Sequence, residues 1–156
     1  MEIDAFRRKP TSNTTISCDI NGFEIPRARA DSDAESSMMS NDIFESLDLE
    51  LELDTQKKND LVFPDEKECK TLGWARNIPV TLSSGFTVTE DFIVYNSKES
   101  YFLLGVPLLD KIHANIDYDK RELRGTFEGK SFTIPISVNS KKYSALAVEI
   151  KKTSYI

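Results

Sequence analysis

The chain has 156 residues, of which 39% are hydrophobic, including nine phenylalanines; this is enough apolar material for one folded domain and too short a chain for two. Its formal net charge is −6 at pH 7 and its pI is near 4.9, which argues against nucleic acid or an anionic membrane as the main partner, because both require a concentrated basic surface. The sequence contains neither an apolar run of the roughly 20 residues that span a membrane nor a signal-peptide core. We therefore expect an intracellular protein, cytoplasmic or nuclear.

The N-terminal part predicts a β-hairpin after a polar, flexible leader at residues 1–13. In TTISCDINGFEIPRARA, residues 14–30, apolar and polar side chains alternate on both sides of Asn21-Gly22, a strong signal for a two-residue hairpin turn. The second strand of this hairpin leads directly into Asp31-Ser32-Asp33.

Residues 40–74 predict a short helix, a strand and an exposed connection, in that order. Ser40-Asn41-Asp42 can cap a helix, and apolar residues follow at helical spacing for about two turns. In residues 47–53 leucine alternates with acidic residues, which predicts a half-buried strand. Residues 55–74 are polar with a Pro-Asp pair, and this composition predicts an exposed hairpin or long loop.

The second half predicts further strands and one more helix. Residues 77–95 read as two strands joined by a Ser-Ser-Gly turn. In YFLLGVPLLDKIHANIDYDKREL, residues 101–123, an apolar strand ends at Gly105, Pro107 starts a helical turn, and strand alternation resumes after His113. FTIPISV supplies another strand, and KKYSALAVEIKK predicts a terminal one.

No motif indicates a metal or a cofactor. Cys18 and Cys69 have neither CxxC spacing nor a neighbouring histidine, so we interpret both as structural thiols. The chain lacks a phosphate-binding glycine loop, zinc-ligand spacing and a Gly-x-Ser-x-Gly elbow. His113 is the sole histidine and lies at a predicted helix end, where a cationic side chain is a favourable cap rather than a catalytic group.

The order is therefore strand, acidic turn, strand, short helix, hairpins, apolar strand to glycine, helix, strand. In this order, and in the hairpin ending at Asp31 and the FLLG strand at 102–105, the chain resembles the retropepsins, the single-domain aspartic proteases of retroviruses and gypsy-class retrotransposons. The resemblance implies an all-β, single-domain fold, a closed β-barrel with a short helix before the C-terminal strands. It covers residues 14–136, and residues 137–156 are expected to form a C-terminal extension, an added strand or tail.

The resemblance also implies roles for the acidic turn. Asp31 matches the catalytic aspartate of the family, Ser32 the hydroxyl residue after it, and Ala34 the alanine that ends the motif. The family has a glycine where this chain has Asp33, because the backbone there packs closely against the aspartate.

Two residues before the aspartate also depart from the family. Arg29 and Ala30 occupy positions that are bulky and apolar in the retropepsins. By strand alternation Arg27 and Arg29 share a face and can pair with Asp31, Asp33 or with Glu35. An arginine paired with Asp31 would favour the ionised carboxylate and oppose protonation.

These departures bear on catalysis because family members are homodimers. Each subunit contributes one aspartate, and the pair shares a proton and activates a water. Asp33 would add two carboxylates near the same axis, where two unit charges ~4 Å apart repel by roughly 4 kcal/mol at an effective dielectric constant near 20. We expect the added acids to stay protonated, to turn away, or to be neutralised by Arg29, and we expect a steric cost from the lost glycine.

Two functions follow as hypotheses. The first is a retrotransposon-derived, catalytically degenerate domain that serves as a dimerisation or protein-interaction module of a larger protein. The alternative is an active homodimeric aspartic endopeptidase that uses Asp31 of each subunit to activate water. In both cases we expect a homodimer and a peptide or protein partner, although the tail could instead cover the dimer edge and keep the chain monomeric. The residues expected to line the substrate or partner groove are Arg29, Glu35, Gly105, Pro64, Asp65 and Glu66.

Overall fold

The predicted N-terminal hairpin is present and opens the fold. Strands β1 (Asn13–Ile20) and β2 (Phe23–Ala30) pair in antiparallel fashion. Asn21 and Gly22 between them have φ angles of 52° and 80°, the two positive values that a type I′ turn requires. The Asn21 side-chain amide also donates to the carbonyl oxygens of Leu47 and Asp48, at 2.7 and 3.0 Å, so the turn anchors the segment that follows the first helix.

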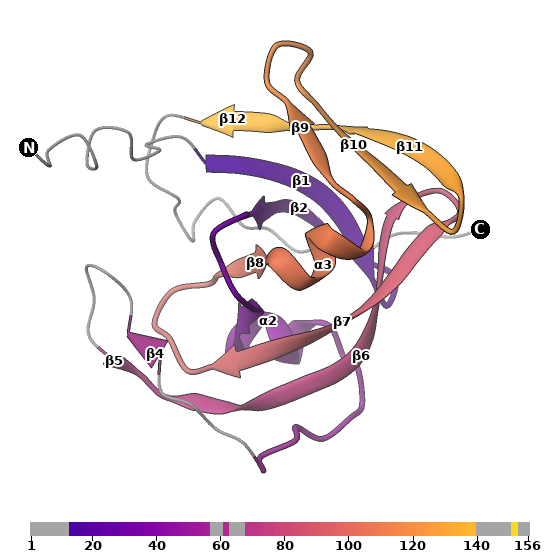
Figure 1. Cartoon of the computed structure of the whole chain (residues 1–156). Coiled ribbons are helices and arrows are strands. Elements are labelled where there is room, and N and C mark those ends of the chain that lie inside the picture. The colour runs from indigo at the N-terminus through magenta and orange to yellow at the C-terminus, as the bar shows by residue number, and fades with distance from the viewer. Residues whose placement is uncertain (1–12, 57–60, 63–67, 140–150, 153–156) are drawn as a thin grey trace, which may run out of the picture.

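The computed structural model describes residues 13–56, 61–62, 68–139 and 151–152 (Figure 1). Two short helices lie among the strands of this part of the chain, α2 (Asn41–Ser46) and α3 (Val106–Lys111). The remaining strands are β3 (Ser37–Ser40), β4 (Leu61–Val62), β5 (Glu68–Cys69), β6 (Thr71–Ser83), β7 (Phe86–Tyr95), β8 (Phe102–Leu104), β9 (Asn115–Asp117), β10 (Glu122–Phe127), β11 (Lys130–Pro135), β12 (Ser137–Asn139) and β13 (Lys151–Lys152).

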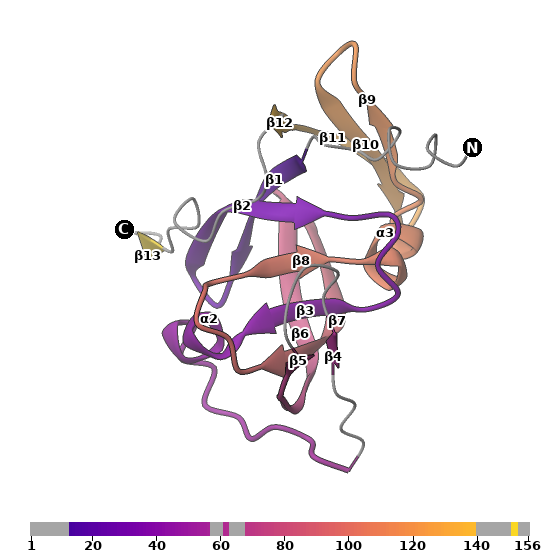
Figure 2. The same ribbon diagram turned by 90° about the vertical axis from the view of Figure 1, so that its left-hand side faces the viewer.

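The strands close into a barrel, as the sequence predicts. The main sheet runs β12-β1-β6-β7-β3-β8-β2-β13, and the additional pairing of β1 with β2 closes the ring from β1 to β2. Two neighbouring pairs are parallel, β2 with β8 and β3 with β7, whereas β3 and β8 run antiparallel. Figure 2 shows β2, β8 and β3 side by side on one wall. The all-β closed barrel is confirmed.

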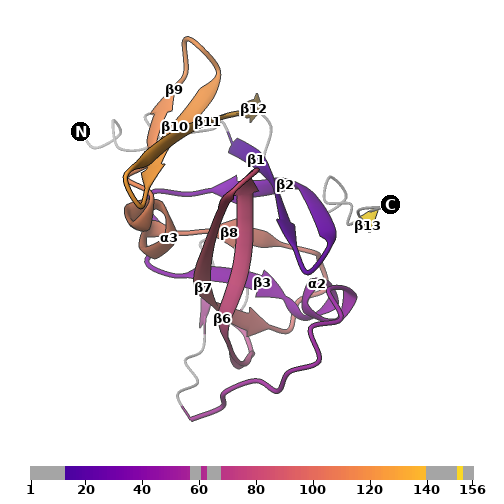
Figure 3. The same cartoon turned by 90° about the vertical axis from the view of Figure 1, so that its right-hand side faces the viewer.

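The barrel interior is filled by large apolar side chains. Phe92 and Phe102 are fully buried, with ring centroids 5.2 Å apart, and burying a side chain of this size contributes about 1.5–3 kcal/mol. Helix α3 buries Leu108 and Leu109. A separate three-stranded sheet, β11-β10-β9, rises beyond this helix (Figure 3).

The strand predicted at residues 47–53 is wrong. This segment has no strand assignment, and Asp48 and Glu50 have φ angles of 50° and 56°, which interrupt an extended backbone. Leu49, Leu51 and Leu53 still pack against the core. Leucine therefore alternates with acidic residues because one side of this segment is buried against the core. No neighbouring strand is paired along residues 47–53.

Other boundaries also differ from the sequence expectation. Strand β6 begins at Thr71, six residues before the predicted strand, while β4 and β5 form an antiparallel pair within the segment predicted to be an exposed hairpin or a long loop. Residues 1–12 of the predicted leader and residues 141–150 of the predicted terminal strand lie outside the described residues, and Asn13, the last residue of the predicted leader, belongs to β1. Within the described ranges, no helix is both long and apolar enough to cross a membrane.

Candidate functional site

The acidic turn is held at the point where β2 and β8 run parallel. Asp31 directly follows β2, and its amide donates to the carbonyl oxygen of Leu104 at 2.9 Å. Two further backbone bonds fix the turn: the Ala34 amide donates to the Asp31 carbonyl at 3.2 Å, and the Val106 amide donates to the Ala34 carbonyl at 2.9 Å. The segments of Asp31 and Gly105, some seventy residues apart in sequence, are thus brought together.

Gly105 lies where no larger residue fits. A Cβ atom built on it would lie 2.7 Å from the Ser36 carbonyl oxygen and 2.8 Å from that of Ala34. Both neighbours are backbone atoms, so a flexible side chain cannot move aside to make room. Glycine at this position lets the end of β8 pack directly against the acidic turn.

Asp33 is accommodated in the turn within one chain. Its amide donates to Asp31 Oδ1 at 2.9 Å, its side chain is exposed, and it is absent from the residues with positive φ. The steric cost expected from replacing the family's glycine is therefore not observed inside the single chain. The cost that remains is electrostatic, because a second carboxylate sits two residues from the first.

Arg29 lies beside Asp31. One guanidinium nitrogen of Arg29 donates to the Tyr101 hydroxyl at 3.1 Å, and the other lies 3.8 Å from Asp31 Oδ2. The Arg29 and Asp31 side chains are 26% and 23% exposed, so this ion pair contributes at most about 1 kcal/mol to stability. Of the predicted arginine–acid pairs around the turn, this is the one that the structure places within ion-pair distance.

A buried hydrogen-bond network holds the backbone of Gly105. The Gly105 amide donates to Ser37 Oγ at 2.8 Å, and Ser37 Oγ donates to Glu90 Oε2 at 2.6 Å. Glu90 is only 4% exposed, and Lys111 Nζ lies 3.6 Å from its other oxygen. A buried carboxylate is costly unless it is paired and hydrogen-bonded, and here both conditions hold.

Sequence reasoning missed this network and Tyr101. Glu90 does carry a signal, because it occupies the position of an apolar side chain in the alternating series of β7, from Phe86 to Val94. Nothing in the sequence marks Ser37, since a serine in a short strand has no distinguishing pattern.

The other predicted residues are distributed as follows. Ser32 and Glu35 are exposed, Ala34 is half-buried and Ala30 is buried. The predicted groove residues Pro64, Asp65 and Glu66 lie outside the described residues.

Cys18 is a buried free thiol, and burial, with the charges of Asp19 and Glu24 adding to it, raises its pKa, which makes it unreactive. In the described part of the chain, no group of three or more His, Cys, Asp or Glu side chains is placed to hold a metal ion.

A closed β-barrel in which an aspartate turn packs against a strand ending in glycine defines a retropepsin-like fold. Among solved structures the chain is similar to the retroviral protease-like domain of Ddi1 from Leishmania major, with 21% sequence identity over 80% of this chain and 94% of that one, and a TM-score of 0.64. No protein-family model matches the chain, and no curated protein matches it either. The fold of this chain is therefore retropepsin-like.

Proposed function

We propose that the chain is a catalytically inactive retropepsin-like domain that acts as a protein-interaction module. The observation that carries this proposal is the position of Arg29, whose guanidinium binds the Tyr101 hydroxyl and lies 3.8 Å from the Asp31 carboxylate. The guanidinium gives the Asp31 carboxylate an ion-pair partner inside its own chain. Aspartic protease chemistry instead needs two aspartates that share one proton.

Asp33 supports the same proposal. In a two-fold dimer with both Asp31 side chains at the axis, the backbone of both Asp33 residues would also lie near it, because each Asp33 amide binds its own Asp31 carboxylate at 2.9 Å, and the exposed Asp33 side chains would add their charge there. Four carboxylates would then share a small region. Each close pair is repelled by roughly 4 kcal/mol at ~4 Å and an effective dielectric constant of about 20, which opposes assembly of a catalytic pair.

A homodimer is the second part of the proposal. Strand β12 forms one end of the main sheet, so among the described strands its outer edge has no partner, and an open edge can pair with a second copy across a two-fold axis. The tail strands β12 and β13 also pair with β1 and β2 of their own chain. This arrangement keeps open the alternative that the tail covers the dimer edge. Retrotransposon origin stays a prediction from the resemblance.

Two hydrogen bonds favour the alternative of an active endopeptidase. The Asp31 carboxylate still accepts the amide of the residue two positions later, and the Asp31 amide is still anchored on Leu104. The backbone of the turn thus keeps a hydrogen-bonded form that could present a carboxylate to a water. Function in that case would require Arg29 to leave Asp31 when two chains meet.

Reversion variants test the proposal. The double variant Arg29→Leu with Asp33→Gly should gain cleavage of an unfolded protein substrate at mildly acidic pH, and Asp31→Asn in that background should abolish the gain. Arg27→Leu with Asp33→Gly is the matched control, because it removes an equal charge from the same strand and should remain inert.

Two results would count against the proposal. Equal activity in both double variants would show that Arg29 has no special role. A chain that sediments as a monomer at all concentrations tested would remove the homodimer from the proposal.

A further inference from the structure

The geometry points to Lys111 as a positioning residue for the acidic turn, acting through Glu90 and Ser37 on the backbone of Gly105. Lys111 is the last residue of α3, outside the turn itself. The inference gives the buried network a direction of control, from an exposed cation to Asp31. It rests on the proposed function only in taking the acidic turn as the functional site of the domain.

The polar groups of this network form one continuous chain. The Gly105 amide donates to Ser37 Oγ at 2.8 Å, and the Ser37 hydroxyl donates to Glu90 Oε2 at 2.6 Å. The other oxygen of Glu90 accepts the Asp91 amide at 3.2 Å and lies 3.6 Å from Lys111 Nζ. A serine hydroxyl has a single proton. Glu90 therefore fixes which way the Ser37 hydroxyl points, and with it the lone pair that faces Gly105.

The members of the chain differ sharply in burial. Ser37 is fully buried and Glu90 is 4% exposed, whereas the Lys111 side chain is 43% exposed. A buried carboxylate that loses its cation is strongly destabilised, and it regains solvation only by moving toward water. Such a movement takes Glu90 Oε2 away from Ser37 Oγ, so the hydroxyl is no longer oriented toward Gly105.

Lys111 is bound to the neighbouring strand rather than to the end of its own helix. Its Nζ also donates to the backbone carbonyl of Thr89, the residue before Glu90 on β7. A lysine in the last turn of a helix can stabilise the helix dipole, but α3 has only six residues. Both contacts of Nζ instead place the cation beside the buried carboxylate.

Gly105 is the residue through which the network reaches the acidic turn. Leu104, the residue before it, accepts the Asp31 amide at 2.9 Å. Val106, the residue after it, donates its amide to the Ala34 carbonyl at 2.9 Å. Figure 2 shows the loop after β2 alongside the end of β8 and the start of α3. Because Gly105 packs on this loop without room for a Cβ atom, its displacement is passed on to the turn.

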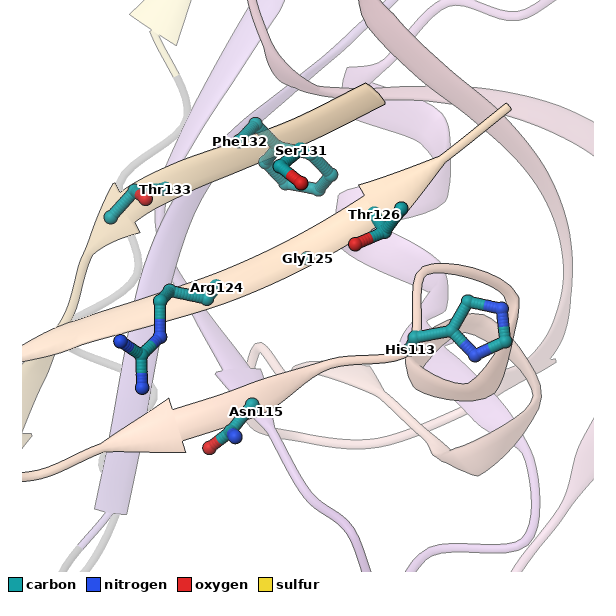
Figure 4. Close-up of a pocket in the computed structure, with 8 residues that line it drawn as sticks. All are labelled: His113, Asn115, Arg124, Gly125, Thr126, Ser131, Phe132 and Thr133. Carbon is teal, nitrogen blue, oxygen red and sulfur yellow. The ribbon is translucent and has the colours of Figure 1, made fainter. Parts of the chain in front are cut away.

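A second ion pair on the surface offers a matched comparison. Arg124 lines the hollow on the outer face of β9, β10 and β11 (Figure 4), and its side chain is 45% exposed, close to the 43% of Lys111. Its partners Asp117 and Glu122 are themselves 21% and 25% exposed, so water can replace the guanidinium. Of the two cations, Lys111 is the one whose removal leaves a carboxylate in the interior.

The test is amide hydrogen exchange of the full chain, followed by NMR. Lys111→Gln should speed exchange of the Gly105 amide by about three- to tenfold, because the ion pair is partly exposed and partly screened, and should shift the amide signals of Asp31 and Val106. Lys111→Arg keeps the charge and should restore the wild-type rate. Arg124→Gln should leave the Gly105 rate within about twofold of the wild type.

A second background shows whether the effect passes through the buried carboxylate. Glu90→Gln keeps an oxygen for the Ser37 hydroxyl and removes the charge, so adding Lys111→Gln there should change Gly105 exchange no further. Ser37→Ala cuts the chain at the hydroxyl and gives the same comparison if Glu90→Gln does not fold. A role for Lys111 in helix stability alone would add the same increment in every background.

Three results would overturn the inference. Unchanged Gly105 exchange in Lys111→Gln would show that the cation does not reach the turn. An equal effect of Lys111→Gln in the wild-type and Glu90→Gln backgrounds would assign Lys111 to the helix alone. A Lys111→Arg variant that behaves like Lys111→Gln would show that the charge is not what matters. None of these readouts uses cleavage or self-association, so their failure is distinguishable from failure of the proposed function.

Discussion

Replacing Gly105 by alanine should destabilise the fold at the junction between β8 and the acidic turn. The new methyl group would lie 2.7 and 2.8 Å from two backbone carbonyl oxygens, distances that real Cβ atoms do not adopt. Either the turn or the start of α3 must move. The bond from the Val106 amide to the Ala34 carbonyl, now 2.9 Å, is the first that such a shift would lengthen.

The expected magnitude follows from two contributions. Overpacking costs about 1–3 kcal/mol, and the loss of one backbone hydrogen bond costs about 1 kcal/mol. Their sum, about 2–4 kcal/mol, corresponds to a fall in Tm of roughly 4–16 °C for a chain of this size.

Thermal and urea unfolding followed by circular dichroism would measure this effect against Gly85→Ala. Gly85 has a φ angle of +83° and no atom within 4 Å of an added Cβ. Its replacement should cost only about 1 kcal/mol of backbone strain. If the two variants lose the same stability, the close packing of β8 against the turn is not as described.

Three other changes have defined outcomes. Burial, and then the charge of Glu24, raise the pKa of Asp19 above 3.8, so its ionised form costs stability at neutral pH. Asp19→Asn should therefore raise the free energy of unfolding by about 0.2–1 kcal/mol at pH 7. In urea unfolding at a pH below 3.8, the ordinary pKa of this carboxyl, the variant and the wild type should be equally stable; a variant that is still more stable at that pH would contradict the assignment. Ser37→Ala should cost about 1–3 kcal/mol in urea unfolding, since it leaves a buried carboxylate without its hydroxyl donor; a neutral result would show that water replaces the hydroxyl. In a Cys69→Ser background the thiol of Cys18 should react with a disulfide reagent only as fast as the chain unfolds; rapid reaction of the native protein would refute its burial.

The Asn21-Gly22 turn signal and the alternation of apolar residues were sufficient to predict the two strands on either side of the acidic turn's contact, the one that ends at Ala30 and the one that leads to Gly105. Asn21-Gly22 specifies a hairpin because both residues accept positive φ, and Gly105 lies at the end of an apolar strand as predicted. The sequence patterns do not by themselves indicate that Asp31 and Gly105 lie close together. That expectation comes from the retropepsin topology, which the resemblance supplies.

The failures have physical causes. The leucines after α2 alternate because one side of the segment lies on the core, and burial alone cannot tell a paired strand from an unpaired one. Glu90 and Tyr101 act through contacts with residues 37 and 29 respectively, distant in sequence and set by the barrel. Such pairings depend on three-dimensional register and leave little trace in one sequence.

The most direct measurement is cleavage of an unfolded protein by the purified wild-type chain at mildly acidic pH, beside Asp31→Asn, with and without a pepstatin-type transition-state mimic. We predict no difference between the wild type and Asp31→Asn, and no effect of the mimic. Cleavage that both the substitution and the mimic abolish would show that Arg29 and Asp33 have not disabled the turn, and would contradict the assignment of an inactive domain.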